Sequence, residues 1–232
     1  MSQEPVALDR RQRRRQETIA EVLDVAAEIM AEQGVAGLSV GEVARRMGIR
    51  PPSLYVYFPS KHALYDALFE RGAQMVLDHV RADAESVSLD GRPLEEVLLH
   101  AAENFVRWSI EHPAYTQLLF WRPVPGFAPS AEAYAPAIEL IQHTRDRFTI
   151  LQRAGLIRRD ATLDDLQRDW TVLISGVISQ QLANAPDEPF AKGRFTTALP
   201  GLVAMFGRHY GLDPRTHSAT RPKKETRRVR NP

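Results

Sequence analysis

Few residues of this chain stand at spacings that catalysis or metal binding would need. His100 and Glu103 are three positions apart on one expected helix face, and Asp164 and Asp165 are adjacent acids at the start of another. A dispersed histidine and an acidic pair at a helix start are more often surface or capping groups than ligands or catalysts. The sequence has no H-E-x-x-H motif, glycine-rich phosphate loop, G-x-S-x-G motif or cysteine. We therefore expect no enzyme activity, no metal site and no cofactor.

A second group of residues has the spacing of a DNA-binding unit. Ser39 and Glu42 form an S-x-x-E capping box for a short helix that ends before Gly48. Pro51 and Pro52 suit the first turn of a second short helix, because N–H groups there have no partner within the helix. Two short helices joined by a tight glycine-containing turn, after a longer amphipathic helix, predict a helix-turn-helix.

The second short helix, expected over about 51–57, divides into an inner and an outer face. Leu54 and Phe58 stand four residues apart and should face the core, while Tyr55 lies at the edge, where its hydroxyl can reach a phosphate. Lys61, at the start of the following helix, adds a cation to a helix end that already favours anions. The positions expected to face outward are Ser53, Val56 and Tyr57.

The segment from about 15 to 75 resembles the DNA-binding domain of tetracycline-repressor-type (TetR-family) regulators. That family's pattern has a turn glycine, a Leu-Tyr pair, two further aromatic or apolar residues and a lysine, which this chain supplies as Gly48, Leu54, Tyr55, Tyr57, Phe58 and Lys61. The resemblance implies that the following residues contact operator DNA: Ser39, Arg50, Pro51, Pro52, Ser53, Tyr55, Tyr57 and Lys61. Arg50 departs from the small residue common there, and the two prolines leave few polar groups, so Arg50 is the expected base reader, bidentate to a guanine.

Apolar residues at spacings of three and four recur along the chain with almost no alternation, so we predict an all-α fold. Long helices are expected at about 16–33, from Ser60 onward, and over 93–113, 132–154, 162–184 and 189–210, with a short helix over 114–121. An N-terminal three-helix helix-turn-helix DNA-binding domain is followed by a helical ligand-binding and dimerisation domain. The expected limits are a basic disordered arm at 1–14, the DNA-binding domain at 15–75, the effector-binding and dimerisation domain at 76–212, and a basic disordered tail at 213–232.

The net charge of +1 hides an uneven distribution of 30 basic and 29 acidic residues. Residues 1–16 carry +3 and residues 214–232 carry +6, whereas residues 63–213 carry −6. The two basic ends are either solvated tails or arms that lie along DNA, and both interpretations stay open. The start is charged and no segment is apolar enough to span a bilayer, so we expect a cytoplasmic protein without a membrane partner.

The middle third is rich in large aromatic residues, and the resemblance implies an effector cavity among its helices. For any single aromatic residue, ordinary core packing is the simpler interpretation. The candidates for lining the cavity, three of them near the irregular 122–130 loop, are Phe105, Trp108, Phe120, Trp121 and Phe148. The polar groups available there are His100, Glu103, Asn104, Gln117 and His143.

The last two long helices carry apolar stripes that suit a homodimer interface. The stripes consist of Leu173, Gly176, Val177 and Gln180, and of Leu199, Leu202, Val203 and Phe206. Helix pairs from two subunits would form a four-helix interface, and one short recognition helix reads few bases, which favours paired half-sites. Packing of the same stripes within one subunit is the alternative.

The sequence therefore predicts a ligand-responsive, dimeric transcription regulator, interpreted as a repressor that binds a palindromic operator. By the resemblance, a small-molecule effector would favour a conformation whose two heads no longer match the operator. Two alternatives stay open: a constitutive DNA-binding protein with a packed, ligand-free body, and a small-molecule-binding protein whose head no longer reads DNA.

Overall fold

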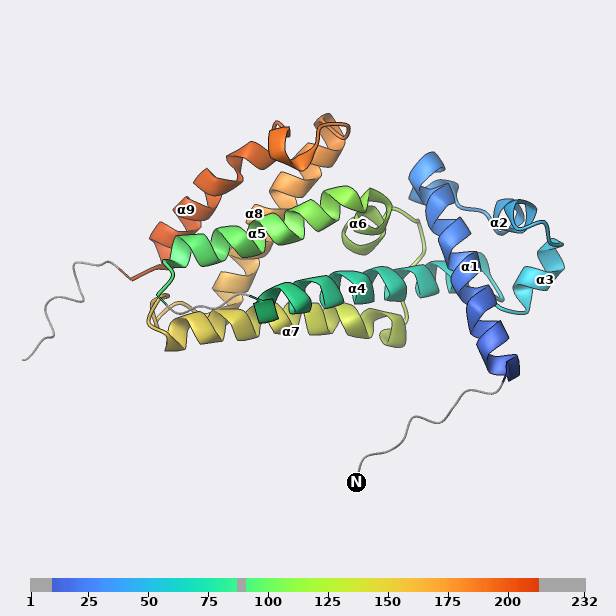
Figure 1. Ribbon diagram of the computed structural model, residues 1–232, viewed down its shortest axis with the longest axis horizontal. Coiled ribbons are helices and arrows are strands. Elements are labelled where there is room, and N and C mark those ends of the chain that lie inside the picture. The colour runs from blue at the N-terminus through green and yellow to red at the C-terminus, as the bar shows by residue number, and fades with distance from the viewer. Residues whose placement is uncertain (1–9, 87–90, 213–232) are drawn as a thin grey trace, which may run out of the picture.

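The computed structural model describes residues 10–86 and 91–212, which form a small head and a long body made of helices (Figure 1). The α-helices are α1 (Arg10–Gln33), α2 (Val40–Arg46), α3 (Pro51–Tyr55), α4 (Lys61–Ser86), α5 (Leu94–Glu111), α6 (Pro113–Phe120), α7 (Ala131–Arg153), α8 (Leu163–Asn184) and α9 (Leu199–Tyr210). Within the described ranges the only β pairing is an isolated bridge between Ile157 and Gly211. The predicted all-α fold is confirmed.

The head is built from α1, α2, α3 and the first turns of α4. The inner face of α1 buries Val22, Ala26 and Ile29, as its apolar spacing predicts. Gly34 follows α1 with φ of 76° and Gly48 follows α2 with φ of 66°, a left-handed conformation that glycine adopts without a Cβ clash. The turn at Gly34 connects α1 to α2, and the turn at Gly48 connects α2 to α3, so the two turns determine the angles between these helices.

Helix α1 begins at Arg10, well before the predicted start near residue 16. The expectation of a disordered arm is therefore wrong for residues 10–14, whereas residues 1–9 and the predicted tail at 213–232 lie outside the described residues. Apolar periodicity locates only the buried part of a helix, and arginine and glutamine are good helix formers that extend it into solvent. The basic run is thus the first turns of α1.

The body is organised around α4, which leaves the head and runs beside α7 (Figure 1). Phe69 stacks on Tyr134 near the head, and Arg81 binds Glu139 farther along, so the two helices run in the same direction. One core cluster joins the head to α4, α6 and Trp108, and a second joins α5, α7, α8 and α9. Across the described residues, we find no helix with the length and hydropathy that a bilayer crossing requires.

The predicted single helix over 189–210 is wrong, because α9 starts only at Leu199. The preceding residues form two short 3-10 turns, Phe190–Lys192 and Thr196–Ala198. Gly193 packs so closely that an added Cβ would lie 2.7 Å from Oε1 of Gln181. Gln181 is fully buried, accepts from the Phe195 N–H at 3.0 Å and donates to the Ala185 carbonyl, which holds this connection in a non-helical path.

The apolar stripes of α8 and α9 mostly pack within the subunit. Val177, Leu199, Val203 and Phe206 are buried in the second core cluster. For these four residues the structure agrees with the intramolecular alternative. A different face of the same helices, which includes Val172 and Met205, stays exposed.

Candidate nucleic-acid interface and ligand cavity

The residues of α3 and the turn after it, up to Phe58, divide into a buried and an exposed face, as predicted for all but Tyr57. Leu54 and Phe58 are buried, and the Phe58 N–H donates to the Leu54 carbonyl at 2.9 Å. Arg50 is the N-cap residue of α3. The exposed positions are Arg50, Pro51, Pro52, Ser53, Tyr55 and Val56. The head therefore presents α3 outward with Arg50 at its leading end.

Tyr57 differs from its expected outward position. Its side chain is half-buried, and the guanidinium carbon of Arg15 lies 5.4 Å from the centre of its ring. This contact ties the basic first turns of α1 to the end of the recognition segment, and a cation over an aromatic face is attractive. Apolar patterning could not reveal this contact, because Arg15 lies outside the amphipathic part of α1.

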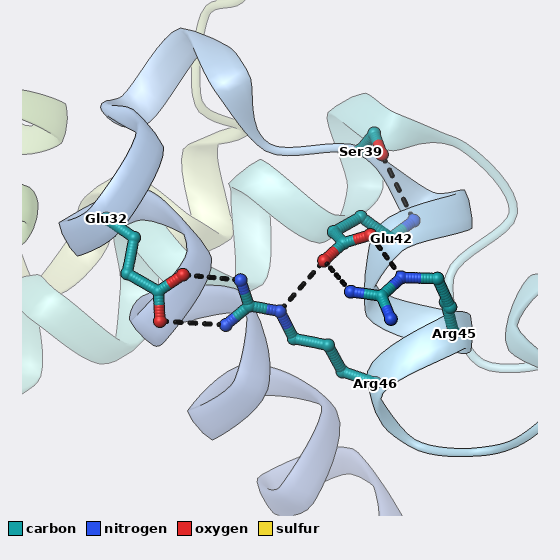
Figure 2. Close-up of polar contacts among 5 residues, drawn as sticks. All are labelled: Glu32, Ser39, Glu42, Arg45 and Arg46. Carbon is teal, nitrogen blue, oxygen red and sulfur yellow. Dashed lines mark hydrogen bonds and ion pairs between the residues drawn. The ribbon is translucent and has the colours of Figure 1, made fainter.

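A polar network locks α2 onto α1 (Figure 2). Ser39 caps α2, with its hydroxyl accepting from the Glu42 N–H at 3.1 Å. The Glu42 carboxylate binds Arg45 and Arg46 rather than completing the predicted capping box, and Arg46 also reaches Glu32 of α1. Hydrogen bonds from Arg45 and then Arg46 lower the pKa of Glu42 to about 2.

The network holds α2 in a fixed place against α1. The Arg46 guanidinium donates two hydrogen bonds to the carboxylate of Glu32, which lies 14 positions earlier in the sequence. Two-pronged arginine–carboxylate pairs fix orientation as well as distance. The sequence analysis missed Arg46, although Glu42 stands at spacings of three and four from Arg45 and Arg46, which favours ion pairs on a helix.

The start of α4 is anchored to the turn after α1. The Tyr65 hydroxyl donates to the Val35 carbonyl at 2.6 Å, and burial raises the pKa of Tyr65. Lys61 donates to the Ala36 carbonyl at 3.3 Å, and Ser60 accepts from the Ala63 N–H, so Ser60 caps α4 as predicted. Lys61 thus stands at the start of α4, as expected, and also connects α4 to the turn after α1.

A cavity of about 870 Å³ lies in the body between α4, α5, α6, α7 and α8. Its volume falls within the range of about 300–1,000 Å³ typical of small-molecule sites. Four of the five aromatic candidates line it: Phe105, Phe120, Trp121 and Phe148. Trp108 does not, because it is buried in the first core cluster and stacks on His112.

The polar candidates divide in the same way. His100, Asn104 and His143 line the cavity, whereas Glu103 and Gln117 do not. His100 lies 2.8 Å from a carboxylate oxygen of Asp83, which also lines it. Asn104 Oδ1 and Gln167 Oε1 are buried without a hydrogen-bond partner in the described part of the chain, so the cavity wall holds polar atoms whose bonding capacity is unused. No cluster of three metal-ligating side chains occurs in residues 10–86 and 91–212.

Helix α6 lies between the head and the cavity. Tyr115 of α6 packs on Gly72 of α4 so closely that a Cβ at position 72 would stand 2.6 Å from its ring. Phe120, at the other end of α6, lines the cavity. A second link joins Asp66 of α4 to Ser130, the N-cap of α7, through two hydrogen bonds of 2.7 Å.

Comparison with known proteins connects this geometry to one class. The family model for the bacterial regulatory proteins of the tetR family matches residues 22–68. The tetracycline repressor protein class C of Escherichia coli is 36% identical over 183 residues, covering 79% of this chain and 75% of that protein.

Two further comparisons bear on the head and on the fold. The uncharacterized HTH-type transcriptional regulator YobS of Bacillus subtilis (strain 168) is 34% identical over 94 residues, covering 40% of this chain and 47% of YobS. The structure of a protein of unknown function from Rhodococcus sp. RHA1 matches with a TM-score of 0.70 over 90% of this chain and 100% of that one. Its identity is 17%, so that likeness concerns the fold alone.

Proposed function

Because the chain belongs to the tetR family of bacterial regulatory proteins, we propose that it is a dimeric repressor that binds a palindromic operator and is released by a small-molecule effector. The family consists of helix-turn-helix transcriptional regulators, so the chain is a regulator and not an enzyme. One observation carries the finer proposal: an exposed α3 on a tightly bonded head is joined, through α4 and α6, to a body with a large cavity.

In this proposal the head, now extended to residues 10–75, reads DNA through Arg50. Arg50 stands exposed at the N-cap of α3, and an arginine there can bind the two acceptors of a guanine. Lys61, at the start of α4, is proposed to contact a phosphate. The other proposed contacts are Ser39, Pro51, Pro52, Ser53, Tyr55 and Tyr57. The ring of Tyr57 also packs against the guanidinium of Arg15.

We propose that residues 76–212 bind the effector and form the dimer through the outer face of α8 and α9. Val172 is 65% exposed and Met205 is 59% exposed, and Leu173 and Leu202 lie half-buried in the shallow groove between them. An apolar face of this kind on two antiparallel helices suits an isologous interface. Such a dimer would space two heads about 34 Å apart, one DNA turn.

The switch is proposed to run through α6. Phe120 of α6 lines the cavity, and Tyr115 of α6 packs on Gly72 of α4 near the head. A ligand that moves α6 would therefore also change how α6 packs on α4. Shifting a two-state equilibrium from 1:99 to 99:1 requires about 5.5 kcal/mol of differential affinity. The effector must therefore bind one of the two conformations more tightly than the other, through contacts that change when α6 moves.

Gel-shift titration with the DNA flanking the protein's own gene tests the proposal. Arg50→Ala should relax base preference at one position per half-site by about 1–3 kcal/mol, whereas Lys61→Ala should weaken all sequences about equally and lower the salt slope by about one per half-site. Arg153→Ala, an exposed body arginine, is the control. The absence of a salt-sensitive, sequence-selective complex in the unmodified chain would show that the head does not read DNA.

A further inference from the structure

The cavity has an aromatic end near the head and a polar end far from it. Near the head, Phe69 stacks on Tyr134 with ring centres 5.7 Å apart, and Phe105 faces Phe120 at 6.0 Å. At the far end of α4 and α7 the lining also includes the polar side chains of Asp83, His100, His143 and Arg147, beside the aromatic rings of Phe148 and Trp170. A site with unlike ends selects a ligand whose own two ends differ in polarity.

Arg147 is the cation at the polar end that lacks a counterion. It is half-buried and lines the cavity, yet it makes no ion pair or hydrogen bond with any residue that the structure describes. The neighbouring arginines are satisfied, since Arg81 binds Glu139 and Arg145 binds Asp164. A half-buried guanidinium beside a mostly apolar cavity would gain a charge-assisted partner from an anion that binds there.

The other polar groups at this end add donors without adding a second free charge. Burial, and then the charges of Arg147 and Arg81, lower the pKa of His143, so His143 is neutral at neutral pH and offers a single N–H. The carboxylate among the lining residues, Asp83, is already bound to His100 at 2.8 Å. One uncompensated cation and one neutral donor match a monoanion.

Resting on the effector-binding function above, we propose that the cavity binds an amphipathic monocarboxylate. Its carboxylate would accept hydrogen bonds from Arg147 and His143, and its apolar body would extend toward Phe105 and Phe120. Bidentate binding of a carboxylate by arginine is strong and oriented, and the aromatic end buries the apolar body.

Calorimetric titration of the full chain, without DNA, tests this ligand class. The probes are dodecanoate, dodecan-1-ol and dodecylamine, which share one apolar chain and differ in headgroup charge. Arg147→Met should weaken dodecanoate binding by about 10- to 100-fold, the range expected for a charge-assisted hydrogen bond, and leave dodecan-1-ol binding unchanged. Arg147→Lys should retain part of the preference. Arg153→Met, at the exposed end of the same helix and away from the cavity, should change nothing.

Equal binding of dodecanoate and dodecan-1-ol, tighter binding of dodecylamine, or no binding of any probe would overturn the proposal, and so would an Arg147→Met variant that binds dodecanoate normally. Operator release is measured separately by gel shift with the same probes. If dodecanoate binds through Arg147 and leaves the operator complex intact, the effector switch fails while the ligand class stands.

Discussion

The head and the body are both helical, but they differ in how completely their side chains are packed and paired. In the head, polar side chains are paired within and between its elements: Glu42 with Arg46 inside α2, Arg46 with Glu32 of α1, and Tyr65 of α4 with the Val35 carbonyl. In the body, a cavity of about 870 Å³ separates α7 from α5, and its wall includes Arg147 and Asn104, whose polar atoms stand without described partners. These polar side chains of the head are paired, whereas the cavity wall of the body holds polar groups without described partners.

This difference indicates which region changes shape. Packed and paired regions respond to perturbation by losing stability, while a region with unused volume and bonding capacity responds by binding. Substitutions that are costly in the head should therefore be cheap in the cavity wall.

Truncation of the recognition helix core should be the most damaging change. Leu54 is 1% exposed, and Leu54→Ala should lower the free energy of unfolding by about 2–5 kcal/mol, because it leaves a void that the small head cannot close. Urea denaturation followed by circular dichroism measures this loss. Val56→Ala, on the exposed side of the same segment, should be nearly neutral; equal losses for the two variants would mean that α3 is not seated as described.

Crowding the junction between head and body should cost less. Gly72→Ala places a Cβ 2.6 Å from the Tyr115 ring and should lower the unfolding free energy by about 1–3 kcal/mol. Tyr115→Leu combined with Gly72→Ala should recover part of that loss, which a double-mutant cycle by urea denaturation reports. Additive losses in the double variant would show that the two side chains do not meet.

Acid should weaken the head through Glu42. Its pKa is lowered from 4.5 to about 2 in the folded chain, so its contribution to stability is complete above pH 4.5 and is lost as the pH falls toward 2. Urea denaturation across that interval should show a falling free energy of unfolding, and Glu42→Gln should flatten the fall. An unchanged pH profile in Glu42→Gln would mean that the network of Figure 2 does not hold the carboxylate.

Truncation at the cavity should have the smallest effect on stability. Phe120 is 42% exposed and lines the cavity, so Phe120→Ala should change the unfolding free energy by about 1 kcal/mol or less. Leu118→Ala on the same helix is the matched control: Leu118 is 2% exposed, does not line the cavity, and should cost about 2–5 kcal/mol. A reversed order in thermal denaturation would erase the contrast between packed and unpacked regions.

The sequence predicted most of the head because each of its elements carries a local signal. Leu54 and Phe58 show helical spacing, Ser39 shows a cap, and Gly48 stands where a left-handed turn is needed. The start of α1 and the Arg15–Tyr57 contact were not predictable in this way, since arginines in solvent leave no periodic pattern.

The body was predicted less well because its features depend on which face of a helix meets which neighbour. Four aromatic candidates line the cavity but Trp108 does not, and no local rule separates Trp108 from Trp121. Arg147 was missed for the same reason: its lack of a counterion becomes visible only when α4, α7 and α8 are placed together. The irregular approach to α9 depends on the buried Gln181, which looks polar and exposed in the sequence.

The two prolines that open α3 restrict how the chain's binding preference can change during evolution. Pro51 and Pro52 have no backbone N–H and hold a nearly fixed φ, so this end of the helix neither donates to DNA nor adjusts its path. Altered operator preference must then arise at the few neighbouring positions with polar side chains, Arg50, Ser53 and Tyr55. Related proteins with the same proline pair should therefore differ in operator mainly through those three residues.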